Sequence, residues 1–310
     1  MTLSNIGHSQ NTTVGKRGLG RGLEALPKGG ILPITKSSLR PRDWIPPYRG
    51  FSGWKLVGNG EARATCGRFW SKGCLDVENH KQSNLDREVV GKAYVKVIKE
   101  SCGKASCPIC YEKWASKEAH RIGYRISQFR CKGSKPIHLV ISPPPILWYK
   151  DLIELKRKAY LISKKAGFLG GSCIIHPFRK DKDLKMWYLS PHFHMIGYGW
   201  IRKVKEVFEA EGWVIKNLGV RKSVEATALY QCSHAGVHPH HHTISWFGAL
   251  AYNRLKVEPE PIEREVCPIC GAELVRLLWA GEGKRNVPDL EGEYFVEPSN
   301  WISMGNRWCG

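Results

Sequence analysis

The sequence predicts an α+β fold in which helices pack on one face of an antiparallel β-sheet. Segments that read as strands alternate with segments of helical period along residues 110–256. Two strand candidates, 171–180 and 186–201, are joined by the short polar link "DKDLK", which is typical of a hairpin and therefore of antiparallel pairing. Two C-x2-C pairs flank this region and indicate small zinc-knuckle elements beside the sheet.

The elements follow one another along the chain with recognisable ends. Apolar residues at helical spacing predict helices over 110–129, 150–167, 203–212, 223–236 and 245–256. The remaining apolar runs predict strands over 135–145, 171–180, 186–201 and 213–222. Ser223 is a favourable N-cap for its helix, and Gly236 is the residue type that closes one.

The charge of the chain points to a polyanionic partner. The formal net charge is +20 at pH 7, and residues 257–310 hold ten acidic and five basic residues, so residues 1–256 carry +25. This excess favours nucleic acid as the partner. The N-terminus has no apolar segment of signal-peptide length, and no apolar run can span a bilayer, so we expect a cytoplasmic protein that does not act on a membrane.

Composition divides the chain into four parts. Residues 1–60 are basic and rich in Gly and Pro, which predicts a flexible arm that contacts phosphates or is an inert solvated tail. Residues 61–130 hold a zinc-binding element and an amphipathic helix, and 131–256 hold the predicted sheet. Residues 257–310 hold an acidic linker, "VEPEPIERE", and a small C-terminal zinc-knuckle module.

Two groups of cysteines are predicted to bind structural Zn²⁺, because a C-x2-C knuckle turns both sulfurs toward one ion. The first predicted set is Cys74, Cys102, Cys107 and Cys110, with Cys66, His80 and His120 as alternative ligands. The second knuckle is Cys267 and Cys270, for which Cys309 is one candidate partner.

A histidine pair lies in the strand candidate "SPHFHMIGYGW". His192 and His194 are two residues apart, so on a strand they face the same side, while Phe193 faces the other. Two imidazoles at this spacing can bind one divalent cation. His176, in the neighbouring strand candidate, is placed to supply a third ligand or to orient one of the first two.

A tyrosine with a histidine one helical turn away supplies a candidate nucleophile. Tyr230 and His234 lie four residues apart in "ATALYQCSHAG" and share a face of the predicted helix. A tyrosine oxygen can attack phosphorus and form a covalent phosphotyrosine. His234 can then bind the phosphate, adjust the proton of the phenol or contact the metal.

These segments, taken in order, resemble the HUH endonucleases. The similarity is to the rolling-circle replication initiators (Rep proteins) of archaeal plasmids and viruses, and it covers residues 66–280 through "CPICYEKW", "HLVISPPP", "IIHPFR", "PHFHMIGYGWI", "LYQCSHAG" and "SWFGALAYNRLK". The resemblance implies a sheet of about five strands of the RNA-recognition or ferredoxin-like type. It also implies that His192 and His194 bind Mn²⁺ or Mg²⁺ and that Tyr230 is the nucleophile.

The sequence departs from the family pattern at one position. Many members have a lysine three residues after the tyrosine, where this chain has Ser233. Tyr252, which has Lys256 four residues later, is therefore an alternative nucleophile.

The resemblance implies a single-stranded DNA nicking and joining activity that initiates rolling-circle replication. The tyrosine becomes linked to the 5′-phosphate of a single-stranded or hairpin origin, and the free 3′-hydroxyl serves a polymerase. The bond energy stays in the phosphotyrosine, so joining needs no nucleotide cofactor. The chain has no G-x4-G-K-[ST] motif, so we expect a host helicase and a host polymerase as partners.

Other functions remain compatible with the sequence. An HUH-type transposase or relaxase would use the same residues on a different target. A non-catalytic zinc-containing DNA-binding regulator would keep the basic charge and the knuckles, and Tyr230 would only pack. A zinc protein that binds RNA also fits the charge, but gives no purpose to the histidine strand.

Overall fold

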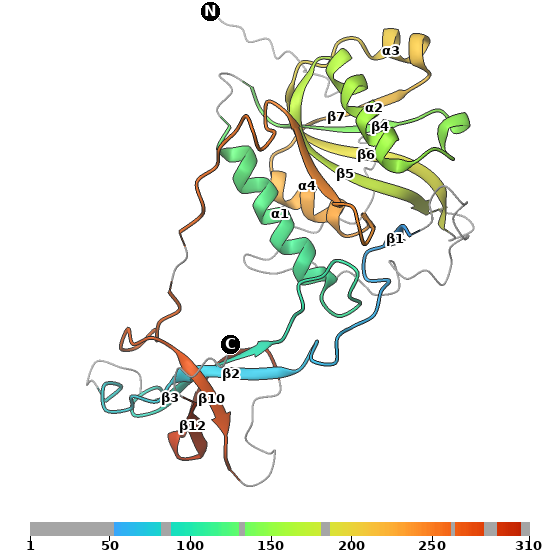
Figure 1. The fold of residues 1–310 in the computed structure, drawn as a ribbon. Coiled ribbons are helices and arrows are strands. Elements are labelled where there is room, and N and C mark those ends of the chain that lie inside the picture. The colour runs from blue at the N-terminus through green and yellow to red at the C-terminus, as the bar shows by residue number, and fades with distance from the viewer. Residues whose placement is uncertain are drawn as a thin grey trace, which may run out of the picture. The chain divides into compact units, whose positions relative to one another are not determined.

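The computed structural model describes residues 53–81, 88–129, 134–180, 187–261, 264–281 and 290–304. Most of the predicted basic arm, 1–60, and the candidate ligand Cys309 lie outside these residues. The described residues all belong to one compact unit, Thr35–Gly310. They form an α+β structure with four α-helices and two five-stranded antiparallel sheets (Figure 1).

The larger sheet, which we call the histidine sheet, confirms the predicted antiparallel sheet of five strands. Its strand order is β7-β4-β6-β5-β9, with β6 in the centre. The strands are β4 (Ile137–Ser142), β5 (Phe168–Lys180), β6 (Trp187–Gly199), β7 (Val214–Val220) and β9 (Ile244–Gly248). β5 and β6 form the predicted antiparallel pair, and their register sets His176 directly opposite His192.

Two of the four α-helices in the described residues begin at a capping side chain. They are α1 (Tyr111–Ser127), α2 (Leu152–Lys165), α3 (Val204–Glu211) and α4 (Val224–Cys232), with two short 3-10 helices, η4 (Pro145–Leu147) and η5 (Pro298–Asn300). The Asp151 carboxylate accepts two backbone N–H bonds at the start of α2, and the Ser223 hydroxyl accepts one at the start of α4. Gly236 does not close α4, because it lies in β8 (Gly236–Val237), which pairs with β1 (Lys55–Leu56).

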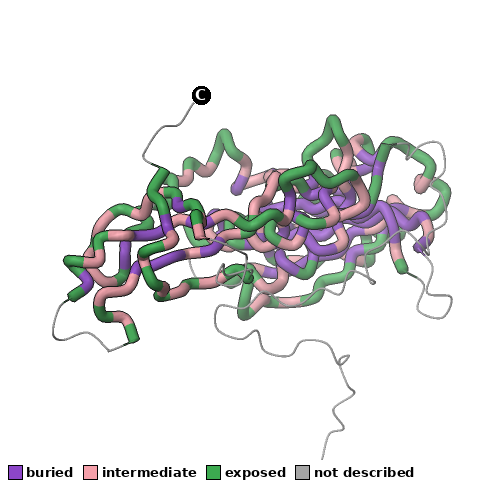
Figure 2. Tube along the Cα trace, turned by 90° about the horizontal axis from the view of Figure 1, so that it is seen from below, coloured by how far each residue is buried: buried purple, intermediate pink, exposed green. Residues whose placement is uncertain are grey.

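Helices cover both faces of the histidine sheet, so the prediction of helices on one face is wrong. On one face, α2 and α3 bury Leu155, Ile162 and Val207 in a core shared with Phe193 of β6. On the other face, the Tyr198 hydroxyl of β6 donates to a carbonyl of α1, and α4 packs against α1 (Figure 1). The central strands are therefore buried on both sides, and Figure 2 shows long runs of buried residues flanked by exposed segments.

The helix predicted over 245–256 is absent, because its first residues form β9 and the following residues form a turn. β9 pairs with β5 at the edge of the histidine sheet. Phe247 stacks on Tyr160 with ring centroids 4.2 Å apart, and Gly248 has a φ of 63°. A Cβ at Gly248 would lie 2.2 Å from the Leu169 carbonyl oxygen, so only glycine allows the chain to turn this close to β5. Edge pairing thus overrides helical spacing.

The smaller sheet joins two distant parts of the chain. Its order is β11-β3-β2-β10-β12, and its strands are β2 (Phe69–Cys74), β3 (Ala93–Lys99), β10 (Val275–Trp279), β11 (Gly292–Val296) and β12 (Trp301–Ser303). Its buried apolar cluster holds four residues, Val95, Val97, Leu277 and Trp301, and Ala93 and Tyr94 of β3 are also buried. None of the helices within the described ranges is both long and apolar enough to cross a membrane.

Candidate metal centres

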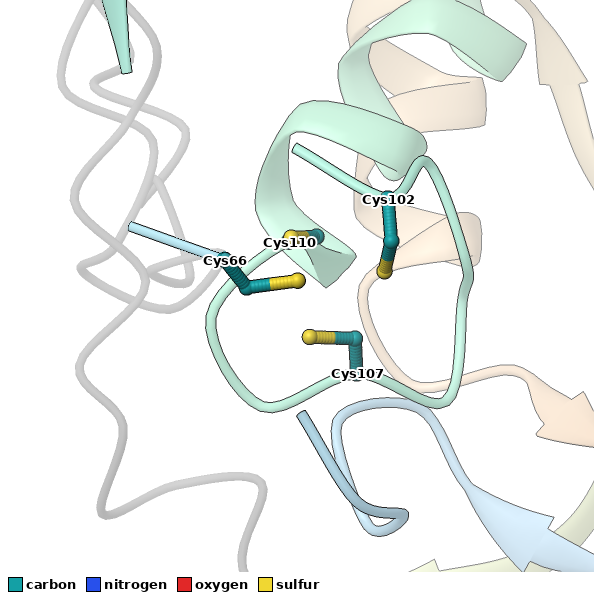
Figure 3. Close-up of side chains that lie close together, drawn as sticks. All are labelled: Cys66, Cys102, Cys107 and Cys110. Atoms are coloured by element: carbon teal, nitrogen blue, oxygen red, sulfur yellow. The ribbon is translucent and has the colours of Figure 1, made fainter. Parts of the chain in front are cut away.

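Four cysteines converge at the start of α1. The sulfurs of Cys66, Cys102, Cys107 and Cys110 lie within 4.8 Å of one another, and Figure 3 shows them pointing toward a common centre. Cys110 is the N-cap residue of α1, so this four-cysteine cluster fixes where the helix begins. Four thiolates in this arrangement suit a tetrahedral Zn²⁺.

The prediction that Cys74 belongs to this cluster is wrong, because Cys66 takes its place. Cys66 precedes β2 and Cys74 ends it. The six residues of an extended strand span about 20 Å, so one ion cannot bind both cysteines. β2 instead connects two separate clusters, and Cys74 belongs to the second one.

The second cluster completes the Cys267–Cys270 knuckle with two residues from the first third of the chain. Its four members are Cys74, His80, Cys267 and Cys270. The Cys74 and Cys270 sulfurs are 3.7 Å apart, close to the edge of about 3.8 Å expected for thiolates 2.3 Å from a tetrahedral Zn²⁺. His80 Nε2 lies 3.3 Å from both the Cys267 and the Cys270 sulfur. His80 Nδ1 donates to the Lys92 carbonyl, which leaves Nε2 as the ligand atom.

The other alternative zinc ligand, His120, lies in neither cluster. Its Nε2 is 2.9 Å from a Glu260 carboxylate oxygen, and its Nδ1 is 3.4 Å from Glu225. Both histidines were predicted as alternative ligands of the four-cysteine cluster, and neither belongs to it. The pairing of β2 with β10 places His80 in the second cluster instead.

The three predicted histidines form a third group. One nitrogen from each of His176, His192 and His194 lies within 4.8 Å of the others, and all three side chains are buried. His192 Nδ1 donates to the Ser190 carbonyl at 2.8 Å. His176 bonds to the Gln231 backbone, and its Nε2 is buried without a hydrogen-bond partner among the described residues. The Nε2 lone pairs of these two rings are therefore available to a cation.

His138, on β4, was not predicted as a site residue from the sequence. It contacts the third ring of the group, His194. Its Nε2 lies 2.9 Å from His194 Nδ1 and 2.9 Å from the Gln231 amide nitrogen. If His138 Nε2 accepts from both donors, His194 Nδ1 carries its proton and His194 Nε2 is free to bind metal. Gln231, adjacent to Tyr230, thus connects α4 to His176 directly through its backbone and to His194 indirectly, because its side chain contacts His138. The sequence predicted a strand at His138, and only the structure shows that this strand pairs with β6.

The electrostatics of the histidine group suit a cation. Burial, followed by repulsion between the rings, holds the pKa values of His176, His192 and His194 well below the ordinary range, so all three are neutral at pH 7. Burial and then Arg221 lower the pKa of His138 to about 4. Three neutral imidazoles with buried lone pairs fit a divalent ion that has further positions open to substrate oxygens.

Tyr230 and His234 lie beside the histidine group. Their ring centroids are 4.4 Å apart, and His234 is 5.2 Å from His176. The Ser233 hydroxyl donates to the Tyr230 carbonyl, so His234 Nδ1 donates to the Ser233 oxygen at 2.7 Å and its Nε2 keeps a lone pair. Burial lowers the pKa of His234 to about 4. The Tyr230 side chain is 58% exposed, so a large substrate can reach its hydroxyl.

Tyr252 lies in a different setting. Its ring lies 4.6 Å from the Arg125 guanidinium, beyond the edge strand β9, and it is 66% exposed. Ring contacts among the described residues connect Tyr230 to the histidine group through His234.

Comparison of the chain with protein-family models, with curated proteins and with solved structures finds no match.

Proposed function

We propose that this protein is a metal-dependent nicking and joining endonuclease of the HUH type that acts on single-stranded DNA through a 5′-phosphotyrosine. One observation carries the proposal: a buried group of three neutral histidines lies beside an exposed tyrosine, with His234 between them. A divalent ion held by the three Nε2 atoms would polarise the scissile phosphodiester and neutralise its developing charge. The net charge of +25 on residues 1–256 suits a polyanionic substrate.

The protein's own residues supply the nucleophile and the proton acceptor. The Tyr230 oxygen attacks phosphorus, the bond from phosphorus to the 3′-oxygen breaks, and the 5′-phosphate remains on the tyrosine. The phenolic proton passes to His234 Nε2, and the leaving 3′-oxygen takes up a proton to become a free hydroxyl. A phosphate beside His234 raises the pKa of its imidazole, which makes it a stronger base when substrate is bound. Attack by a 3′-hydroxyl reverses these steps and joins the strand.

Tyr230 is the preferred nucleophile over Tyr252. The phenol must lie near the group that accepts its proton and near the cation that binds the phosphate. Tyr230 has His234 against its ring, whereas the Tyr252 ring lies on the guanidinium of Arg125.

The test is a cleavage assay on single-stranded circular and hairpin DNA with Mn²⁺, followed by mass spectrometry of the covalent adduct. The tryptic peptide 223–254 contains both tyrosines, so fragment ions must locate the modified residue. We expect the adduct on Tyr230, and we expect Tyr230→Phe to bind DNA without cleaving it.

The remaining outcomes separate the alternatives. An adduct on Tyr252 would keep the reaction and overturn the assignment of the nucleophile. DNA binding without any adduct, across several metals and substrates, would favour a non-catalytic zinc-containing regulator. Target preference in the same assay distinguishes an initiator, which acts on an origin with host helicase and polymerase, from a transposase or relaxase.

A further inference from the structure

A cavity of about 750 Å³ lies between α1, β9 and the segment 257–260. Among the aromatic side chains that line it are Trp114 from α1, Trp246 from β9 and Tyr252 from the turn that follows. A volume of this size accommodates a small organic ligand. The proposed nicking reaction does not use any of these three rings.

The cavity opens on the same face of the histidine sheet as the metal ligands. Ile244, which lines the cavity, lies opposite Ile174 of β5, and Ile174 lies opposite His194 of β6. Directly opposed residues of antiparallel strands point to the same face. Ile244 and His194 are therefore two strand spacings apart, about 10 Å. A single DNA strand at the histidine group can place a neighbouring nucleotide at the cavity.

Arg125 holds two of the aromatic rings in place before any ligand binds. Its guanidinium lies 5.1 Å from the Trp246 ring and 4.6 Å from the Tyr252 ring. Its N–H groups donate to the carbonyls of Leu250 and Leu255. The side chain is only 8% exposed, so these bonds fix its position. Ordered rings lose little conformational entropy when they bind a flat ligand.

The charges of the lining favour a base over a phosphate. Glu118 already pairs with Arg121 at 2.8 Å, and Glu260 pairs with His120 at 2.9 Å. Glu258 is the third acidic residue of the lining. The three acidic residues of the lining outnumber its two arginines, Arg121 and Arg125, and carboxylates can accept hydrogen bonds from the edge of a nucleobase.

We propose that this cavity binds an unpaired nucleobase of single-stranded DNA by stacking on Tyr252, Trp246 and Trp114. The inference rests on the proposed function for its choice of polymer. It gives Tyr252 a binding role that needs the aromatic ring and not the hydroxyl. The base enters the cavity, and the sugar–phosphate backbone stays outside it, toward the histidine group.

The experiment measures fluorescence anisotropy of a labelled single-stranded oligonucleotide without metal, so that binding is read apart from cleavage. Tyr252→Ala removes the ring and should weaken binding by about 5- to 150-fold, the range for losing one base stack. Tyr252→Phe keeps the ring and should restore most of the affinity. Trp114→Ala should weaken binding in the same range. Phe208→Ala is the matched control, since Phe208 is an exposed aromatic residue of α3, on the opposite face of the histidine sheet.

A duplex of the same sequence provides the second comparison, because its bases are paired and cannot enter the cavity. Tyr252→Ala should leave duplex binding within twofold of wild type. Equal losses on duplex and single strand, or single-strand binding within twofold of wild type in both alanine variants, would overturn the inference. Thermal denaturation of each variant checks that it is folded.

The two proposals fail separately. If no phosphotyrosine forms but Tyr252→Ala still weakens single-strand binding selectively, the cavity binds bases and the nicking proposal falls. If Tyr230 forms the adduct while Tyr252→Ala and Trp114→Ala both bind like wild type, nicking stands and the base-binding role of the cavity is wrong.

Discussion

The histidine group and the two cysteine clusters use metal ligands in opposite ways. The three histidines project from the long, buried strands β5 and β6, which an extensive apolar core holds together. The four-cysteine cluster at the start of α1 has almost no apolar core beyond the cysteines themselves. The Cys74–His80–Cys267–Cys270 cluster adds mainly Tyr94. The histidine sheet is therefore expected to fold without its ion, whereas the elements around the cysteines need theirs.

The number of ligands follows the same division. Each cysteine cluster offers four ligand atoms, which closes a tetrahedral site, while the histidine group offers three. A closed site stabilises structure and an open one can bind substrate. The surroundings of a metal site, more than its ligands, therefore indicate whether loss of the metal unfolds the region or only removes its chemistry.

The largest expected effect is the loss of the smaller sheet when a cysteine cluster is broken. Cys270→Ser removes one of three thiolates that join β2 to β10, and structural Zn²⁺ contributes about 10–16 kcal/mol of apparent binding free energy. We expect zinc content to fall from two ions per chain to one, and β10 and β12 to lose protection from hydrogen exchange. Cys173→Ser is the control, because Cys173 is a buried thiol outside the clusters and should leave both ions bound. Full protection of β10 in Cys270→Ser would contradict the structural role.

The next effect falls on chemistry and not on folding. His192→Ala should reduce nicking about 10³-fold, since a bound cation supplies several kcal/mol of transition-state stabilisation. Zinc content and hydrogen exchange of the smaller sheet should remain as in wild type. Unfolding of the histidine sheet in this variant would remove the contrast between the two kinds of site.

A smaller effect is the acid sensitivity of the metal-free histidine sheet. Burial lowers the folded-state pKa of His138 to about 4, below the unfolded value near 6.5. The folded state then binds fewer protons, so its stability is fully present above pH 6.5 and falls as the pH drops toward 4. The slope is about 1.4 kcal/mol per pH unit for each such histidine. Urea unfolding across this pH range measures the slope. His138→Gln should lower it by the contribution of one histidine, and an unchanged slope would refute the assignment.

The smallest effect concerns the orientation of His194. His138→Leu removes the hydrogen-bond partner of His194 Nδ1 and should weaken Mn²⁺ binding about 10- to 100-fold. His138→Gln keeps an acceptor near the same position and should recover much of that affinity. Val140→Ala, beside His194 on the same face, controls for loss of packing. Isothermal titration with Mn²⁺ gives the affinities, and equal losses in all three variants would show that only packing matters.

Local patterns made much of this structure predictable. The histidine strand, the β5–β6 pair and the Cys107–Cys110 knuckle depend on residues close in sequence, and each lies where spacing predicted it. His192 and His194 share a face because strand geometry requires it. The N-cap at Ser223 was readable from residue type alone.

The remaining features depend on pairing between distant segments. Cys74 and Cys66 are equally plausible ligands until β2 is known to be an extended strand between them. The segment 245–256 has helical spacing, but pairing with β5 makes its start a strand. The hydrogen bond from Gln231 to His138 joins residues 93 positions apart, and no local signal announces it.

The discontinuous build of the smaller sheet has a consequence for the timing of synthesis. β2 and β3 leave the ribosome about 175 residues before β10, which corresponds to roughly 9–35 s at ordinary elongation rates. A two-stranded hairpin is marginal in water, and in that interval Cys74 and His80 provide only half of a metal site. The histidine sheet, Ile137 to Gly248, emerges meanwhile and has all its strands. Closure of the cluster formed by Cys74, His80, Cys267 and Cys270 must therefore wait until the last two cysteines have been made, after every strand of the histidine sheet.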